Sequence, residues 1–215
     1  MTSGGRELLK WIALVLMTGD HVLTVFGLGY VPVVSELGRV AFPVFALVMA
    51  YNLAQSGADS GKSALRLVLW GLAATPAAAM AFGQILPLNV LLTFAAAAGG
   101  IWATERRQWA LVALLALVAP VLLDYAWPGV WLVLAGWRWY RRQDGQSWLV
   151  WGCMGLLCLY NGNAWALLAI PLLRLGRSDV AIPRLGRVFY GYYIGHLGLL
   201  ACIAALPSNG FLLAA

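Results

Sequence analysis

The chain has 215 residues, of which 62% are hydrophobic and only 10% are charged, and its mean hydropathy is +0.82. A soluble domain of this length cannot cover so much apolar surface with so few charges, so the composition excludes that class. The net charge of +6 is better explained by basic loops of a membrane protein than by binding to nucleic acid, which we do not expect as a partner. These features predict an all-α, polytopic integral membrane protein with a single domain over residues 1–215.

Apolar segments follow one another along the whole chain and predict about nine transmembrane helices in a lipid bilayer. They cover residues 10–29, 34–54, 64–83, 87–103, 109–123, 127–139, 148–160, 163–173 and 186–206. The sixth and eighth segments are short for a spanning helix, which needs about 20 residues. We expect these two to be tilted, re-entrant or broken around Pro128 and Pro171.

Basic residues occur in every second loop between these segments, and the intervening loops lack them. Because basic residues collect in cytoplasmic loops, the pattern predicts a cytoplasmic N-terminus and a C-terminus on the outer side. Of the 14 lysines and arginines, only Arg39 falls outside this pattern.

The first segment carries an acid and an imidazole side by side, Asp20 and His21, ten residues after Lys10. Ten residues of helix rise roughly 15 Å, about half the thickness of the hydrocarbon core, so the pair is expected near the midplane. Groups of this kind are costly to bury in a bilayer and usually mark a functional site. Lys10 lies at the cytoplasmic mouth of the same helix, where it suits the phosphate groups of an anionic donor.

Arg39 lies in the outer half of the second segment and needs either a partner or a water-filled cavity. Asp20 is the simplest partner, although the pair could merely lock two helices, or Arg39 could extend to the surface. His196, in the last segment, lies at a depth similar to that of His21, and Tyr192 and Tyr193 stand one turn before it. Two histidines at matching depth, near an acid and an arginine, indicate a site.

The remaining polar residues give weaker indications. Asn89 and Thr93 are four residues apart and face the same way on a helix. Asp124, Asn161 and Asn163 are expected in surface loops. The three cysteines have no histidine or carboxylate at metal-ligand spacing, so we expect neither a disulfide nor a metal site.

These residue types are suited to acyl transfer. A neutral histidine in a protected cavity makes a good general base, and an arginine or second imidazole can stabilise a developing oxyanion. The donor would come from the cytoplasm and the acceptor from outside. Proton-coupled transport would need similar groups, so the residues by themselves leave both classes open.

Four stretches resemble the TraX family of conjugative pilin acetylases, in the family's order and over most of the chain. They are residues 9–21, 38–45, 89–93 and 189–197. The first stretch is also similar to the signature of the broader membrane-bound acyltransferase-3 group, a basic residue followed about ten residues later by histidine. One departure is Ile194-Gly195, where we expect the family to have a proline before the last histidine.

The resemblance implies a multi-pass enzyme of the bacterial inner membrane, with its C-terminus in the periplasm. This enzyme would acetylate the N-terminal amino group of a pilin subunit with acetyl-CoA. His21 would be the leading catalytic residue, either as a base or through an acetyl-histidine intermediate. Asp20 would orient the site and balance Arg39, and Arg39 or His196 would stabilise the oxyanion.

Candidates for holding acetyl-CoA are Lys10, Tyr193, Asn89 and Thr93, and cytoplasmic arginines are further candidates for its phosphate groups. An acyltransferase that modifies an envelope glycan or lipid stays open as an alternative. A small proton-coupled transporter is the alternative from another class.

Overall fold

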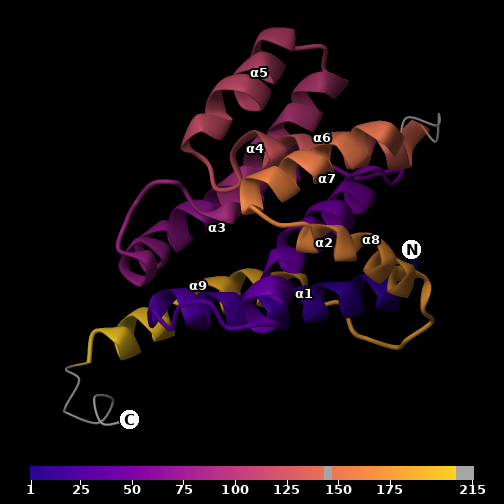
Figure 1. The fold of residues 1–215 in the computed structure, drawn as a ribbon. Coiled ribbons are helices and arrows are strands. Elements are labelled where there is room, and N and C mark those ends of the chain that lie inside the picture. The colour runs from indigo at the N-terminus through magenta and orange to yellow at the C-terminus, as the bar shows by residue number, and fades with distance from the viewer. Residues whose placement is uncertain (143–146, 207–215) are drawn as a thin grey trace.

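The structure is a computed structural model that describes residues 1–142 and 147–206, and its regular elements in these ranges are all helical (Figure 1). The α-helices are α1 (Ser3–Val25), α2 (Val34–Leu53), α3 (Ser60–Phe82), α4 (Val90–Glu105), α5 (Trp109–Ala113), α6 (Ala126–Arg142), α7 (Ser147–Asn161), α8 (Ala169–Leu172) and α9 (Gly186–Ala204). The predicted all-helical fold and the number of nine helices are confirmed over the described residues. The direction in which the chain crosses a membrane stays a prediction.

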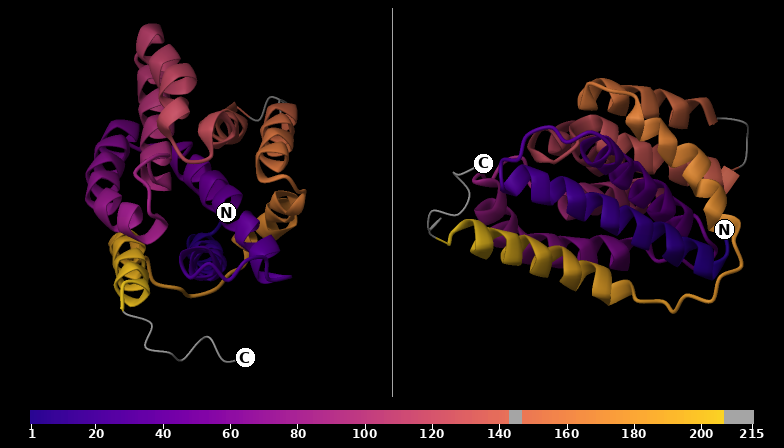
Figure 2. Two further views of the ribbon diagram at one scale, coloured as in Figure 1. Left: turned by 60° about the vertical axis from the view of Figure 1, so that its left-hand side comes forward. Right: turned by 60° about the horizontal axis from the view of Figure 1, so that its bottom comes forward.

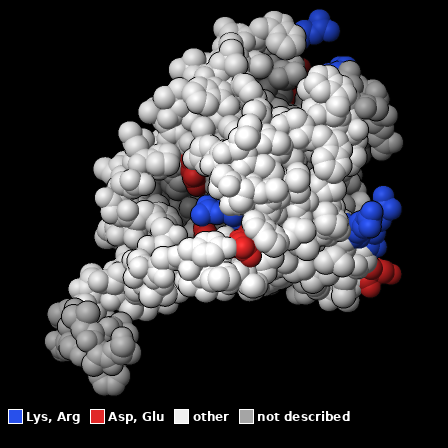
Figure 3. All heavy atoms as spheres, in the orientation of Figure 1, with Lys and Arg blue, Asp and Glu red and all other residues white. Residues whose placement is uncertain are grey.

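Three helices of the described chain, α1, α2 and α3, are long and apolar enough to cross a bilayer. Such helices satisfy their backbone hydrogen bonds internally, which is the requirement for a segment surrounded by lipid. Figure 3 shows one face of the molecule with few charged side chains, which gather at its edges and inside a central hollow. These features support the predicted membrane protein.

The predicted segment 109–123 is not one regular helix. After α5 the chain continues as a π-helix, η1 (Leu114–Val118), and a 3-10 helix, η2 (Ala119–Leu122). Pro120 has no backbone N–H, and the irregular turns leave carbonyl groups without helical partners. The indole N–H groups of Trp127 and Trp131 donate to two of these, the carbonyls of Leu117 and Ala116, at 3.0 and 2.8 Å.

The predicted segment 163–173 is also broken, as its length indicated. It consists of η3 (Trp165–Leu168), α8 and η4 (Leu173–Arg177). These short pieces return the chain to the N-terminus, where the Thr2 N–H donates to the Gly176 carbonyl at 2.8 Å. The Thr2 hydroxyl also donates to the carbonyl of Ser178 at 2.6 Å.

Several basic residues meet where the N-terminus, the end of α2 and the connection before α9 come together, and we call this the basic end. Here Arg6 donates to Asn52 at 2.6 Å and Arg184 donates to Ser3 at 2.7 Å. The backbones approach closely, because a Cβ atom on Gly4 would lie 1.6 Å from the carbonyl oxygen of Val180. The first turn of α1 is therefore fixed against the 176–180 backbone.

The first and last described helices, α1 and α9, run side by side in the same direction (Figure 2). The hydroxyl groups of Thr18 and Tyr192 form a hydrogen bond between them at 2.8 Å. The rings of Trp11 and Phe189 pack nearer the basic end, with their centroids 5.2 Å apart. This pairing brings the two histidine-bearing segments, predicted to lie at one depth, into contact.

Candidate active site

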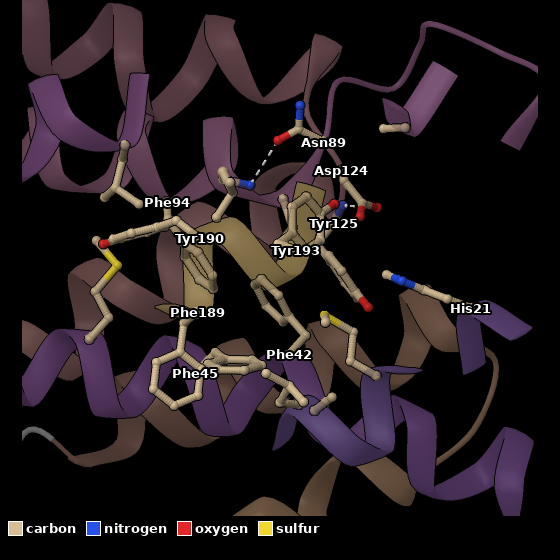
Figure 4. A pocket seen from close by; sticks show the side chains of 18 of the residues that line it. His21, Phe42, Phe45, Asn89, Phe94, Asp124, Tyr125, Phe189, Tyr190 and Tyr193 are labelled. Carbon is tan, nitrogen blue, oxygen red and sulfur yellow. Dashed lines mark hydrogen bonds between the residues drawn. The ribbon is translucent and has the colours of Figure 1, made fainter. Parts of the chain in front are cut away.

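A cavity of about 740 Å³ is lined by residues of α1, α2, α3, α4 and α9 and by the connection before α6. This volume lies in the range of ordinary small-molecule sites. Its lining includes Lys10, Arg66 and Arg187 toward the basic end and Asp20, Arg39 and Asp124 toward the other end. His21, Phe42 and Tyr193 also line it. Figure 4 shows these aromatic rings together with the imidazole of His21.

His21 and His196 form a hydrogen bond across the α1–α9 contact. The distance between Nδ1 of His21 and Nε2 of His196 is 2.8 Å, and the two ring planes differ by only 5°. The other nitrogen of His196, Nδ1, lies 2.8 Å from the backbone carbonyl oxygen of Tyr192. Three groups therefore form one chain of hydrogen bonds that ends in the cavity wall.

This chain fixes which nitrogen carries each proton when both rings are neutral. The carbonyl oxygen of Tyr192 only accepts, so Nδ1 of His196 must donate to it. Nε2 of His196 then carries a lone pair and accepts the Nδ1–H of His21. The proton of His21 is thus held on Nδ1, and its Nε2 atom keeps a lone pair with no hydrogen-bond partner among the described residues. His21 presents a base to the cavity.

Aromatic side chains hold the His21 ring on its remaining sides. Phe82 of α3 meets the ring edge to face, with centroids 5.3 Å apart. Tyr193 packs against both imidazoles, at 6.2 Å from His21 and 5.7 Å from His196. His196 is buried and is not part of the cavity lining, so it acts on His21 rather than on a ligand.

Asp20 and Arg39 both line the cavity, but they form no direct ion pair in the described part of the chain. The expected closed pair is therefore replaced by a looser group of charges, in which Asp124 is a second acid. Arg39 interacts electrostatically with both carboxyl groups. A guanidinium without a direct partner is available to an anion that forms inside the cavity.

The prediction that Asp124 is a surface loop residue is wrong, because its side chain lines the cavity. It lies between η2 and α6, outside the predicted spanning segments. Burial raises the pKa of Asp124 to about 6, while the N–H of Tyr125 and the charge of Arg39 act in the opposite direction. An acid in an apolar loop that lacks basic residues was the available signal in the sequence.

Gly38 of α2 leaves the space that Asp20 of α1 occupies. A Cβ atom at position 38 would lie 2.6 Å from Cβ and 2.8 Å from Cγ of Asp20. We therefore expect Gly38→Ala to displace the carboxyl group and lower the free energy of unfolding by about 1–3 kcal/mol. Thermal unfolding in detergent measures this loss. Gly152→Ala on α7 is the control, because a Cβ there meets nothing within 4 Å; equal stability of the two variants would contradict the expectation.

Three basic residues line the basic end of the cavity, and they differ in how available their charges are. Lys10 lines it, but its ammonium group pairs with Glu7 at 2.6 Å and lies 4.6 Å from the centre of the Phe189 ring. Arg66 of α3 and Arg187 of α9 line the same region, are exposed, and make no ion pair within the described residues. These two arginines are thus the more available cations for phosphate.

Asn89 and Thr93 are committed to internal hydrogen bonds. The Asn89 amide caps α4 by accepting from Leu91 at 3.2 Å and donates to the carbonyl of Gly71 at 2.9 Å. Asn89 also lines the cavity, whereas Thr93 is fully buried and is not in the lining. The Thr93 hydroxyl donates to the backbone carbonyl of Asp124 at 2.8 Å, which holds this loop.

Comparison with known proteins finds relatives that match most of the chain. The family described as TraX protein matches residues 5–204. Protein TraX of Escherichia coli is 34% identical over 183 residues, which cover 83% of this chain and 69% of that protein. Protein TraX of Escherichia coli strain K12 is 31% identical over 183 residues, which again cover 83% of this chain and 69% of that protein. No solved structure matches the chain.

Proposed function

Because the chain belongs to the TraX family, we propose that it is a multi-pass acetyltransferase of the bacterial inner membrane. It transfers an acetyl group from acetyl-CoA to the N-terminal amino group of a pilin subunit. The observation that carries this proposal is the hydrogen-bond chain from Tyr192 through His196 to His21, which presents a free base to the cavity. The resemblance of the sequence to the conjugative pilin acetylases is the reason for proposing acetyl-CoA as the donor and a pilin amino group as the acceptor.

In the proposed reaction, Nε2 of His21 takes a proton from the amine while the amine nitrogen attacks the carbonyl carbon of the thioester. The reference pKa of an α-amino group, about 7.7–8.0, leaves part of the acceptor neutral. Arg39 stabilises the oxyanion that develops on the carbonyl oxygen. The C–N bond forms, the C–S bond breaks, and the thiolate receives the proton from His21. The products are an amide and the thiol of CoA.

The polarity of the cavity supports separate entry of the two substrates. Its basic end offers Arg66 and Arg187 to the phosphate groups of acetyl-CoA, and we propose that this end faces the cytoplasm. The acceptor then enters from the end that contains Asp20 and Asp124 and meets the thioester beside His21.

Removal of both cavity arginines tests the donor site. We expect Arg66→Gln with Arg187→Gln to raise the KM for acetyl-CoA about tenfold with little change in kcat, because phosphate contacts are kept through the reaction. Steady-state kinetics of the purified protein in detergent measures both constants. Arg106→Gln is the control, because Arg106 lies over the Trp102 ring and is not in the cavity lining. An unchanged KM in the double variant would remove these residues from the donor site.

The function itself is tested by co-expressing the protein with a pilin and measuring the intact mass of the pilin. We expect one added acetyl group at the pilin N-terminus, absent when the protein is not expressed. Acetyl groups on an envelope glycan or lipid, with an unmodified pilin, would contradict the acceptor but keep the acyl transfer. Acid-driven uptake of a solute without turnover of acetyl-CoA would contradict both.

A further inference from the structure

Asp124, in the connection between η2 and α6, lines the cavity but has no role in the proposed acetyl transfer so far. Its backbone is fixed on both sides, because the Asp124 N–H donates to the carbonyl of Leu88 at 2.9 Å and its carbonyl accepts from Thr93 at 2.8 Å. Oδ1 of its side chain accepts the N–H of Tyr125 at 2.9 Å. The other oxygen, Oδ2, has no hydrogen-bond partner in the described residues. Asp124 is thus a fixed acceptor with one free oxygen.

This free oxygen shares the cavity with the free nitrogen of His21. Both residues line the cavity, and Figure 4 shows the Asp124 carboxylate and the His21 ring on facing sides of one space. Nε2 of His21 and Oδ2 of Asp124 can each accept a hydrogen bond, and neither can donate one in these protonation states. The space between them is complementary to a group with two hydrogens.

A neutral primary amine has two N–H hydrogens and one lone pair, whereas a hydroxyl group has a single hydrogen. With one N–H directed to His21 and the other to Asp124, the lone pair of the amine remains for attack on the thioester. A hydroxyl group that donates to His21 has no second hydrogen for the half-buried Asp124 carboxylate, so this hydrogen bond is lost when a hydroxyl acceptor fills the cavity. The charged residues at this end of the cavity also favour an amine. Two acids, Asp20 and Asp124, face one arginine, Arg39, which favours an acceptor that arrives as a cation.

We propose that Asp124 selects a primary amine as the acceptor, by accepting one of its N–H groups while His21 accepts the other. This inference rests on the proposed acetyl transfer. It assigns the specificity for nitrogen over oxygen to one side chain that touches the substrate. The proton bound to an arriving ammonium group leaves to water at the acceptor end before the neutral amine attacks.

The test compares two acceptor peptides with the pilin N-terminal sequence, one with its α-amino group and one with an α-hydroxyl group in its place. Purified wild-type protein and Asp124→Asn are supplied with acetyl-CoA, and kcat/KM is measured for each peptide. We expect the preference of the wild type for the amine to fall by about 10- to 100-fold in the variant, with an unchanged KM for acetyl-CoA. Asparagine keeps an oxygen for the N–H of Tyr125 but presents an NH₂ group where Oδ2 was.

Asp59→Asn is the matched control, because Asp59 caps α3 away from the cavity and asparagine is an equally good cap. Its preference should equal that of the wild type. If Asp124→Asn does not accumulate, Asp124→Ser replaces it, since a hydroxyl oxygen can also accept from Tyr125. An undiminished preference for the amine in the folded variant would overturn the role of Asp124. A wild-type protein that acetylates neither peptide would instead contradict the proposed function.

Discussion

Replacement of His21 by alanine is expected to lower the rate of acetyl transfer by about 10²–10⁴-fold, the usual contribution of general acid–base catalysis. The Nε2 atom of His21 is the unpartnered base of the hydrogen-bond chain, and the described cavity lining contains no second imidazole. If His21 instead carries the acetyl group as an acetyl-histidine intermediate, the variant cannot form that intermediate, and the loss is equally large. Either route predicts that kcat falls and that the KM for acetyl-CoA changes little.

The measurement is single-turnover acetylation of the pilin peptide by purified protein, with thermal unfolding to show that the variant is folded. Thr24→Ala is a suitable control on the same helix, because Thr24 lines the cavity rim but its hydroxyl donates only to the Asp20 carbonyl. Full activity of His21→Ala with normal protein level would contradict both the base and the acetyl-histidine routes.

Loss of the second imidazole should have the next largest effect. In His196→Leu, the Nδ1–H of His21 has no acceptor, so the ring is free to rotate and to move its proton to Nε2, where it blocks the base. We expect kcat to fall by less than the roughly 10⁴-fold loss that follows removal of the carboxylate behind a catalytic histidine, because His196 is a neutral acceptor. Because His196 does not line the cavity, the KM values for both substrates should stay within a few fold.

A conservative replacement separates this positioning role from a packing role. His196→Gln keeps an oxygen that can accept the Nδ1–H of His21, so it should recover part of the rate that leucine loses. Thr18→Val removes a different polar contact between α1 and α9, its bond to the Tyr192 hydroxyl, and should leave the rate nearly unchanged. If glutamine and leucine at position 196 gave the same rate and pH profile, the hydrogen bond would have no role in catalysis.

The depth of a residue along a regular helix could be predicted from the sequence. The two histidines of the site could be found in this way because both lie in regular helices. His21 and His196 lie in α1 and α9, which are continuous from the basic end, so counting residues placed them at one level. The tautomer of His21 could not be found this way. It depends on the hydrogen bond between Nδ1 of His196 and the backbone carbonyl of Tyr192, together with the contact between the two imidazoles. Residue types alone do not reveal these contacts.

The position of Asp124 and the pairing of Lys10 both depend on local helix geometry. Counting fails at Asp124 because the preceding segment is broken into α-, π- and 3-10 turns, each with a different rise per residue. Lys10 is the leading candidate from the sequence, beside the cytoplasmic arginines, because it shares a helix with His21. Its pairing with Glu7 depends on the (i, i+3) geometry of α1, which the sequence did contain.

The contact between His21 and His196 joins residues 175 positions apart, on the first and last helices of the described chain. Because the N-terminal helices are synthesised first, nearly all of the described chain is made before α9, the partner of α1, exists. An incomplete chain therefore holds His21 without the acceptor that orients it. Under the proposed mechanism, His21 would gain its oriented base only once α9 has been made and has packed against α1.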